Sequence, residues 1–153
     1  MALLAGPEVT LTLQIALAGV LASIIGWQRH HVGRPAGVRT HALVAMAAAM
    51  FTLAGIYGFG GPTGTRDPTR VAAQIVSGIG FIGAGTIFRS ENTVYGLTTA
   101  ATLWFAAAQG VLVGAGLEVV AALASGLALV VLVVAGAIER RGERHEPVDA
   151  PHG

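Results

Sequence analysis

Three glycines in residues 78–83, GIGFIG, have the spacing with which dinucleotide-binding proteins bring a backbone close to a pyrophosphate. That chemistry needs a buried strand before the glycines, a helix opening at them and an acidic residue about 20 positions later. Here the preceding residues predict a helix already under way, because Asp67 is a good N-cap and Pro68 suits the first helical position. The segment about 20 positions beyond the glycines, LTTAATLWFAA, contains no carboxylate. We therefore expect no nucleotide site.

Asp67 and Arg70 place a carboxylate and a guanidinium one helical turn apart. The structural interpretation is a helix start, in which Asp67 caps the free N–H groups and pairs with Arg70. The functional interpretation is a carboxylate at a membrane mouth that binds a cation or a partner. The sequence favours the cap, and Asp67 is the one weak candidate for a metal ligand.

The amide of Gln74 and the polar side chains of Thr98, Thr102 and Gln109 lie in apolar surroundings. Spacings of four and seven place Thr98, Thr102 and Gln109 on one helical face together with Phe105. Such groups form interhelical hydrogen bonds of roughly 0.6 to 2 kcal/mol each, which is the favoured interpretation. They could also line a small polar core, but they are too few to indicate an ion pathway.

No other residues form a recognisable catalytic or cofactor site. His30 and His31 are adjacent and would diverge on a helix, and no carboxylate accompanies them as a zinc site would require. The chain has no cysteine, and no nucleophile is paired in sequence with a base. We expect a protein that is not an enzyme and that has no cofactor.

The composition indicates that lipid surrounds these residues. The 153 residues are 54% hydrophobic and 11% charged, with a mean hydropathy of +0.70, whereas a soluble domain carries about 25% charged residues. The net charge of +1 argues against a nucleic-acid partner. The fold class expected is an all-α integral membrane protein.

Five apolar segments have about the 20 residues that a membrane-spanning helix needs. They are residues 9–27, 40–59, 68–88, 95–113 and 117–138. Only GAG, residues 114–116, separates the last two, which predicts a tight antiparallel helical hairpin, the alternative being one broken helix.

The nine basic residues are all arginine, and their positions predict the orientation. Seven lie after the first, third or fifth segment: Arg29, Arg34, Arg39, Arg89, Arg140, Arg141 and Arg144. Arg66 and Arg70 lie on the opposite side. Because short cytoplasmic loops retain positive charge, we expect the N-terminus outside and the C-terminus inside. The segment MALLAGPE lacks the basic start of a secretory signal, so the first segment is expected to be retained.

The glycines of the third segment have a different use in this setting. On a helical wheel, Ala73, Ser77, Gly80 and Ala84 form a narrow stripe of small residues. Arg70, Gln74, Gly78 and Gly85 lie beside it, and Ile75, Ile79 and Ile82 take the other side. A stripe of small residues lets a membrane helix approach a neighbour closely. We expect a packing surface; a permeation path or a helix break near residues 83–85 is the less favoured interpretation.

Three stretches in one order carry a family resemblance. PAGVRTHALVAMAAAMF, DPTRVAAQIVSGIGFIGAGTIFR and VYGLTTAATLWFAAAQGVLVGAG strongly resemble the MgtC/SapB family of bacterial membrane proteins, over about residues 26–116, and we expect the resemblance to continue through the fifth segment. The resemblance implies a multi-pass inner-membrane protein of about five spans with an outside N-terminus. It identifies Asp67 as the family's characteristic aspartate, with Arg39, Arg70, Gln74 and the run Gly78, Gly80, Gly83 and Gly85 as further motif positions.

The resemblance also implies a function. Family members are associated with growth under magnesium limitation and with survival of pathogens inside macrophages. The best-studied members look like regulators that act through other membrane proteins, including the proton-driven ATP synthase, and not like magnesium transporters.

Two departures from the family pattern limit what carries over. The family often has Glu-Arg after the first span, whereas this chain has Gln28-Arg29, so no role resting on that carboxylate carries over. Many members have a soluble ACT-like domain after the last span, whereas this sequence ends at Gly153. We expect a membrane domain over residues 1–139 and a short disordered cytoplasmic tail over residues 140–153.

The leading hypothesis is a membrane regulator whose third helix docks onto a neighbour, either a second copy or another membrane protein. The alternative is a small cation transporter or channel with Asp67 at the outer mouth.

Overall fold

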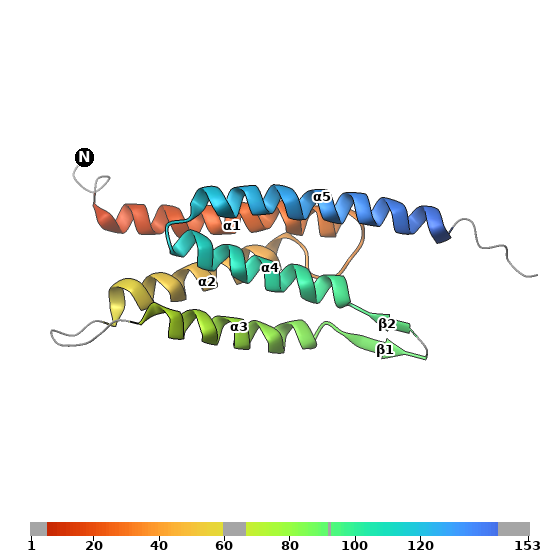
Figure 1. Ribbon diagram of the computed structural model, residues 1–153, viewed down its shortest axis with the longest axis horizontal. Helices are drawn as coiled ribbons and strands as arrows, with labels where there is room; N and C mark the ends of the chain where they lie inside the picture. Colours follow the sequence, from red (N-terminus) through yellow and green to blue (C-terminus); the bar gives the residue numbers. More distant parts are fainter. Residues whose placement is uncertain (1–5, 60–66, 92, 144–153) are drawn as a thin grey trace, which may run out of the picture.

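The computed structural model describes residues 6–59, 67–91 and 93–143, with residues 140–143 described by their backbone only. Five α-helices follow one another: α1 (Pro7–His31), α2 (Val38–Leu53), α3 (Pro68–Ala84), α4 (Leu97–Gly114) and α5 (Glu118–Glu143). A π-helical turn, Ala54–Gly58, extends α2. The helices run alternately in opposite directions along one bundle (Figure 1). The expected all-α membrane fold is confirmed.

Four of the helices are long and apolar enough to cross a membrane: α1, α2 with its π turn, α4 and α5. The third predicted segment differs, because α3 has 17 residues and ends at Ala84, before the predicted end at about residue 88. At 1.5 Å per residue it is about 26 Å long, a little less than the roughly 30 Å hydrocarbon core. After Gly85 the backbone turns, and Thr86 donates its hydroxyl to the carbonyl of Gly83 at 2.8 Å.

A β-hairpin that the sequence analysis missed follows this turn. Strand β1 (Phe88–Ser90) pairs antiparallel with β2 (Thr93–Tyr95), and the rings of Phe88 and Tyr95 stack with their centroids 5.3 Å apart. The sequence feature that could have predicted it is the run Thr93–Tyr95, whose β-branched and aromatic residues favour a strand. Gly96 (φ +86°) then starts α4, and a Cβ there would lie 1.9 Å from the carbonyl oxygen of Thr86, so only glycine fits.

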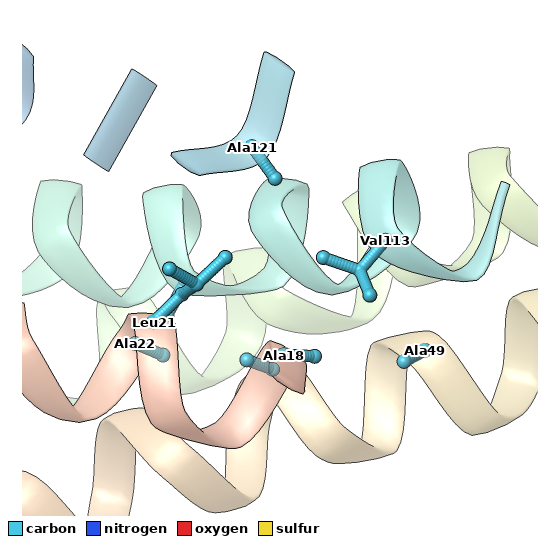
Figure 2. Close-up of a cluster of buried hydrophobic side chains, with 8 residues drawn as sticks. Ala18, Leu21, Ala22, Ala49, Val113 and Ala121 are labelled. Carbon is cyan, nitrogen blue, oxygen red and sulfur yellow. The ribbon is translucent and has the colours of Figure 1, made fainter. Parts of the chain in front are cut away.

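The core is built from small side chains at the meeting point of four helices. Figure 2 shows Ala18, Leu21 and Ala22 of α1 with Ala49 of α2, Val113 of α4 and Ala121 of α5. Alanine-lined faces bring backbones close together, which gives membrane helices their van der Waals contact.

Glycines of α1 and α4 provide the closest helix contacts, and both helices pack against α2. A Cβ on Gly110 of α4 would lie 2.1 Å from the carbonyl oxygen of Ala45, and one on Gly114 would lie 2.9 Å from Cβ of Thr52. On α1, a Cβ on Gly26 would lie 2.8 Å from Cα of Val38. The small-residue seams used inside the protomer therefore surround α2.

The predicted hairpin of the last two segments is confirmed, and the broken-helix alternative is wrong. Gly116 has φ +80°, Leu117 donates its N–H to the carbonyl of Leu112 at 2.9 Å, and Gly116 donates to Val113 at 3.0 Å. This is a Schellman motif, in which a left-handed glycine satisfies the last carbonyls of a helix. The chain therefore reverses between α4 and α5.

Helix α5 carries most of its large apolar side chains on the outside of the bundle. It continues to Glu143, beyond residue 139, where the predicted membrane domain ends. The rest of the predicted tail, residues 144–153, lies outside the described residues.

Candidate functional site

The first turn of α3 begins at Asp67. Its carboxylate accepts a hydrogen bond from the N–H of Thr69 at 3.1 Å and another from the Thr69 hydroxyl. Asp67 is therefore the N-cap of α3, and Pro68 follows at the first position, where an N–H is not required.

Hydrogen bonds determine the protonation of this exposed carboxyl group. The Thr69 hydroxyl lowers the pKa of Asp67 below its usual range, and the Thr69 N–H and the nearby positive charge of Arg70 act in the same direction. The carboxylate is ionised at neutral pH, as a helix N-terminus favours.

The small-residue stripe of α3 faces away from the protomer. Ala73, Ser77, Gly80 and Ala84 are all exposed. A Cβ built on Gly78 or Gly80 meets no atom of the described residues within 4 Å.

The opposite face of α3 makes its contacts with the bundle. Ile79 is buried, and a Cβ on Gly83 would lie 3.6 Å from Cβ of Ala100 on α4. The predicted packing surface therefore has no neighbour among the described residues.

An open groove of about 540 Å³ lies between α2 and α3, next to the stripe. Its walls include Leu43, Phe51, Val71, Ile75 and Ile82, and Gln74 is the one polar side chain among the described residues that line it. Gly78 also lines the groove, and Gln74 and Gly78 both lie beside the stripe on α3, so the groove adjoins the stripe.

Most of the polar residues of α4 make contacts inside the bundle. Gln109 is buried and donates from Nε2 to the Ser125 hydroxyl on α5, and Ser125 donates in turn to the carbonyl of Ala121 at 2.7 Å. Thr102 is buried but donates to the carbonyl of Thr99 at 2.9 Å, a bond within α4 and not the interhelical bond predicted for it. The predicted interhelical hydrogen bond of Gln109 is confirmed.

The structure does not bring the sequence-predicted polar residues together. Gln74 is exposed on α3, whereas Thr102 and Gln109 are buried in α4. Thr98 is exposed at the start of α4, and the neighbouring Thr99 is the buried one. The single polar face expected for α4 therefore lacks Thr98, and Thr99 in the same turn takes the buried position against α1.

The remaining motif positions are scattered. Arg39 is exposed in the first turn of α2, Arg70 is exposed in the first turn of α3, and Gly85 is the exposed C-cap of α3. The GIGFIG sequence lies inside α3 and not at a turn from a strand to a helix. Among the described residues, no group of three or more His, Asp or Glu side chains could hold a metal ion.

Two polar groups that sequence reasoning missed lie where α1 meets α4. Arg29 is 6% exposed and donates from Nη2 to the Thr99 hydroxyl at 3.3 Å. The signal for Arg29 was its position near the end of an apolar helix, where an arginine otherwise reaches toward water.

Comparison with known proteins agrees with this architecture. The MgtC family model matches residues 15–141. The chain is 40% identical over 126 residues to a protein named putative magnesium transporter YhiD from Escherichia coli K12, covering 80% of this chain and 59% of the relative. It is 52% identical over 111 residues to protein MgtC of Brucella abortus strain 2308, covering 72% and 45%.

A third relative, protein MgtC of Salmonella typhimurium strain LT2, is 50% identical over 104 residues, covering 68% of this chain and 43% of the relative. The chain thus spans about half the length of the curated relatives it matches. No solved structure matches it. A family model that covers most of the chain, relatives at this identity and a bundle of apolar helices together show that this multi-pass membrane protein belongs to the MgtC family.

Proposed function

We propose that this protein is a non-enzymatic regulator in a bacterial inner membrane, and that it acts through contacts between α3 and a helix of another membrane protein or of a second copy. Family resemblance links this role to growth under magnesium limitation and to intracellular survival.

The observation that carries the proposal is the unpacked small-residue stripe of α3. The seams of α1 and α4 bury their glycines against α2, whereas a Cβ on Gly78 or Gly80 of α3 meets no described residue within 4 Å. Small residues give a helix exposed to lipid little side-chain contact, but they allow a second helix to approach closely. The adjoining groove supplies an apolar wall for the side chains of that second helix.

The test is Gly80→Leu, which fills the stripe without touching the protomer. The matched control is Gly126→Leu, because Gly126 of α5 is also exposed and a Cβ there meets nothing within 4 Å. The readout is complementation of growth in low magnesium in a strain that lacks the protein. We expect Gly80→Leu to lose complementation while both variants accumulate in the membrane at the wild-type level. Wild-type growth with Gly80→Leu would refute the docking role.

A cysteine scan separates the two kinds of partner. The chain has no cysteine of its own, so Ser77→Cys puts a single thiol in the stripe. Oxidation of the purified protein that gives a disulfide-linked dimer identifies a second copy as the partner. Cross-linking only in whole membranes identifies another protein. Cross-linking no stronger than that of Gly126→Cys in both settings would contradict docking at this face.

The name of the Escherichia coli relative supports one alternative, cation transport. In that function Asp67 would bind the cation at the mouth of the protein. It predicts magnesium or proton flux in liposomes that disappears with Asp67→Asn. If neither wild type nor variant carries flux over a panel of cations, transport by this chain is excluded under those conditions.

A further inference from the structure

A second, polar cavity of about 470 Å³ lies at the end of the bundle where the β-hairpin joins α4. It is formed by the last turn of α1, the connection to α2, the hairpin, the first turn of α4 and the last part of α5. In Figure 1 these segments meet at one end of the molecule, far along the bundle from the start of α3.

Arg29 is the buried cation of this cavity. It is 6% exposed, and among the described residues its side chain makes one hydrogen bond, to the neutral Thr99 hydroxyl, while its Nε has no partner there. A buried guanidinium that lacks an acceptor is costly, and a charged acceptor repays that cost best.

Arg34 adds a second cation to the same cavity. Gly33 adopts φ +69°, and Arg34 donates its N–H to the carbonyl of Arg29 at 3.1 Å, which holds the chain in a Schellman turn. Arg29 and Arg34 both line the cavity, where their like charges oppose each other. An anion between the two guanidinium groups would replace this repulsion with attraction on both sides.

The first turn of α4 also lines the cavity and contributes the positive end of a helix. Gly96 is its N-cap and has no side chain to cap the helix, so the N–H groups of residues 97–99 donate to no capping side chain. The positive end of a helix with free N–H groups binds oxyanions.

The only carboxylate among the described residues lining the cavity is Glu139 of α5, which is exposed. Gln28, beside Arg29 in sequence, is a neutral amide whose Oε1 is buried and has no partner among the described residues. The positive charge that lines the cavity, from two arginines and a helix N-terminus, therefore exceeds the negative charge of one exposed carboxylate.

We propose that this cavity binds a phosphate group through Arg29, Arg34 and the N-terminal amides of α4. Apolar side chains beside these groups, Leu97, Val131 and Leu132 among them, also line the cavity. A phosphate attached to an apolar body fits both halves, so the structure favours the headgroup of an anionic phospholipid over a free phosphate compound.

The test uses the purified full chain in a neutral detergent, with the unfolding temperature measured as three probes are added. The probes are short-chain phosphatidylglycerol, short-chain phosphatidylcholine and inorganic phosphate. A ligand that binds the folded state raises this temperature in a concentration-dependent way. We expect phosphatidylglycerol to give the largest increase.

The variants are Arg34→Gln, which removes an exposed cation, and Gln28→Glu, which adds a carboxylate beside Arg29. Each should lower the affinity for phosphatidylglycerol, obtained from the concentration dependence of the unfolding temperature, by roughly tenfold. That is the effect of losing one charge-assisted hydrogen bond. The control, Arg89→Gln, removes an exposed cation of β1 that does not line the cavity and should leave the affinity unchanged.

The outcomes separate the sources of phosphate. A response to phosphatidylglycerol that depends on Arg34 and Gln28 supports a lipid headgroup. An equal response to inorganic phosphate with the same dependence supports a soluble phosphate compound at the same site. A response that Arg89→Gln weakens as much as Arg34→Gln, or no response to any probe, overturns the proposal. Arg29→Gln is not needed for this decision, which therefore stands even if that variant fails to fold.

Discussion

At the scale of single residues, Gly110 decides how closely α4 approaches α2. The Cβ of an alanine at this position would lie 2.1 Å from the carbonyl oxygen of Ala45 and 2.8 Å from Cβ of Ala48. Neither a backbone carbonyl nor a methyl group can rotate out of the way, so the two helices would have to separate.

The expected result of Gly110→Ala is a loss of about 3 kcal/mol in the free energy of unfolding, at the upper end for overpacking. Gly126→Ala makes the same chemical change in open space and should be neutral or stabilising by up to about 1 kcal/mol, since alanine is the better helix former. Unfolding in mixed detergent micelles, followed by circular dichroism, measures both. Equal stability of the two variants would show that the α2–α4 contact is looser than described.

Asp67 illustrates a residue whose charge and capping role can be separated. Asp67→Ala should lower the unfolding temperature. Asp67→Ser should lower it much less, because serine can also cap α3. If the two variants were equally destabilised, capping would not be the role of Asp67.

The pH dependence of the Asp67 cap follows from its lowered pKa. A carboxyl group whose pKa falls on folding stabilises the protein fully above its unfolded-state pKa of about 4. That contribution is lost as the pH falls through the lower, folded-state value. The difference in unfolding temperature between wild type and Asp67→Asn should therefore disappear in acid.

At the scale of helices, the hydrogen bond from Gln109 to Ser125 joins α4 to the otherwise loosely packed α5. Buried hydrogen bonds between membrane helices contribute about 0.6 kcal/mol on average and up to about 1.7 kcal/mol. A double-mutant cycle with Gln109→Leu and Ser125→Ala should give a coupling energy in this range. A coupling energy of zero would mean that the bond contributes no net stability.

Helix α3 differs from α1 and α4 because its stripe of small residues is exposed, whereas the glycines of those helices pack against α2. Sequence periodicity located its stripe and its N-cap, since both depend on spacing along one helix. It could not tell which face of α3 would point into the protomer. The glycines of α1 and α4 both pack against α2, and this arrangement of faces is decided only when the helices pack.

At the scale of the whole molecule, the arginines predict an outside N-terminus and an inside C-terminus. Single cysteines in place of exposed Arg34, between α1 and α2, and exposed Ala115, between α4 and α5, test this orientation in a chain free of other thiols. A membrane-impermeant maleimide applied to intact spheroplasts should label position 115 but not position 34. The reverse pattern would invert the topology.

The sequence by itself determined the lipid setting, the number and approximate limits of the helices, the cap at Asp67 and the reversal at residues 114–116. These features depend on composition and on residues close together in the chain.

Only the tertiary structure decided that α3 keeps its small residues exposed and that Gln74 lies apart from Thr102 and Gln109. The same holds for the cavity that Arg29 shares with Arg34 and the start of α4. The physical reason is that these features join residues up to 70 positions apart, as in the bond from Arg29 to Thr99. Such contacts depend on which helix faces pack together, and a helical period alone does not specify that choice.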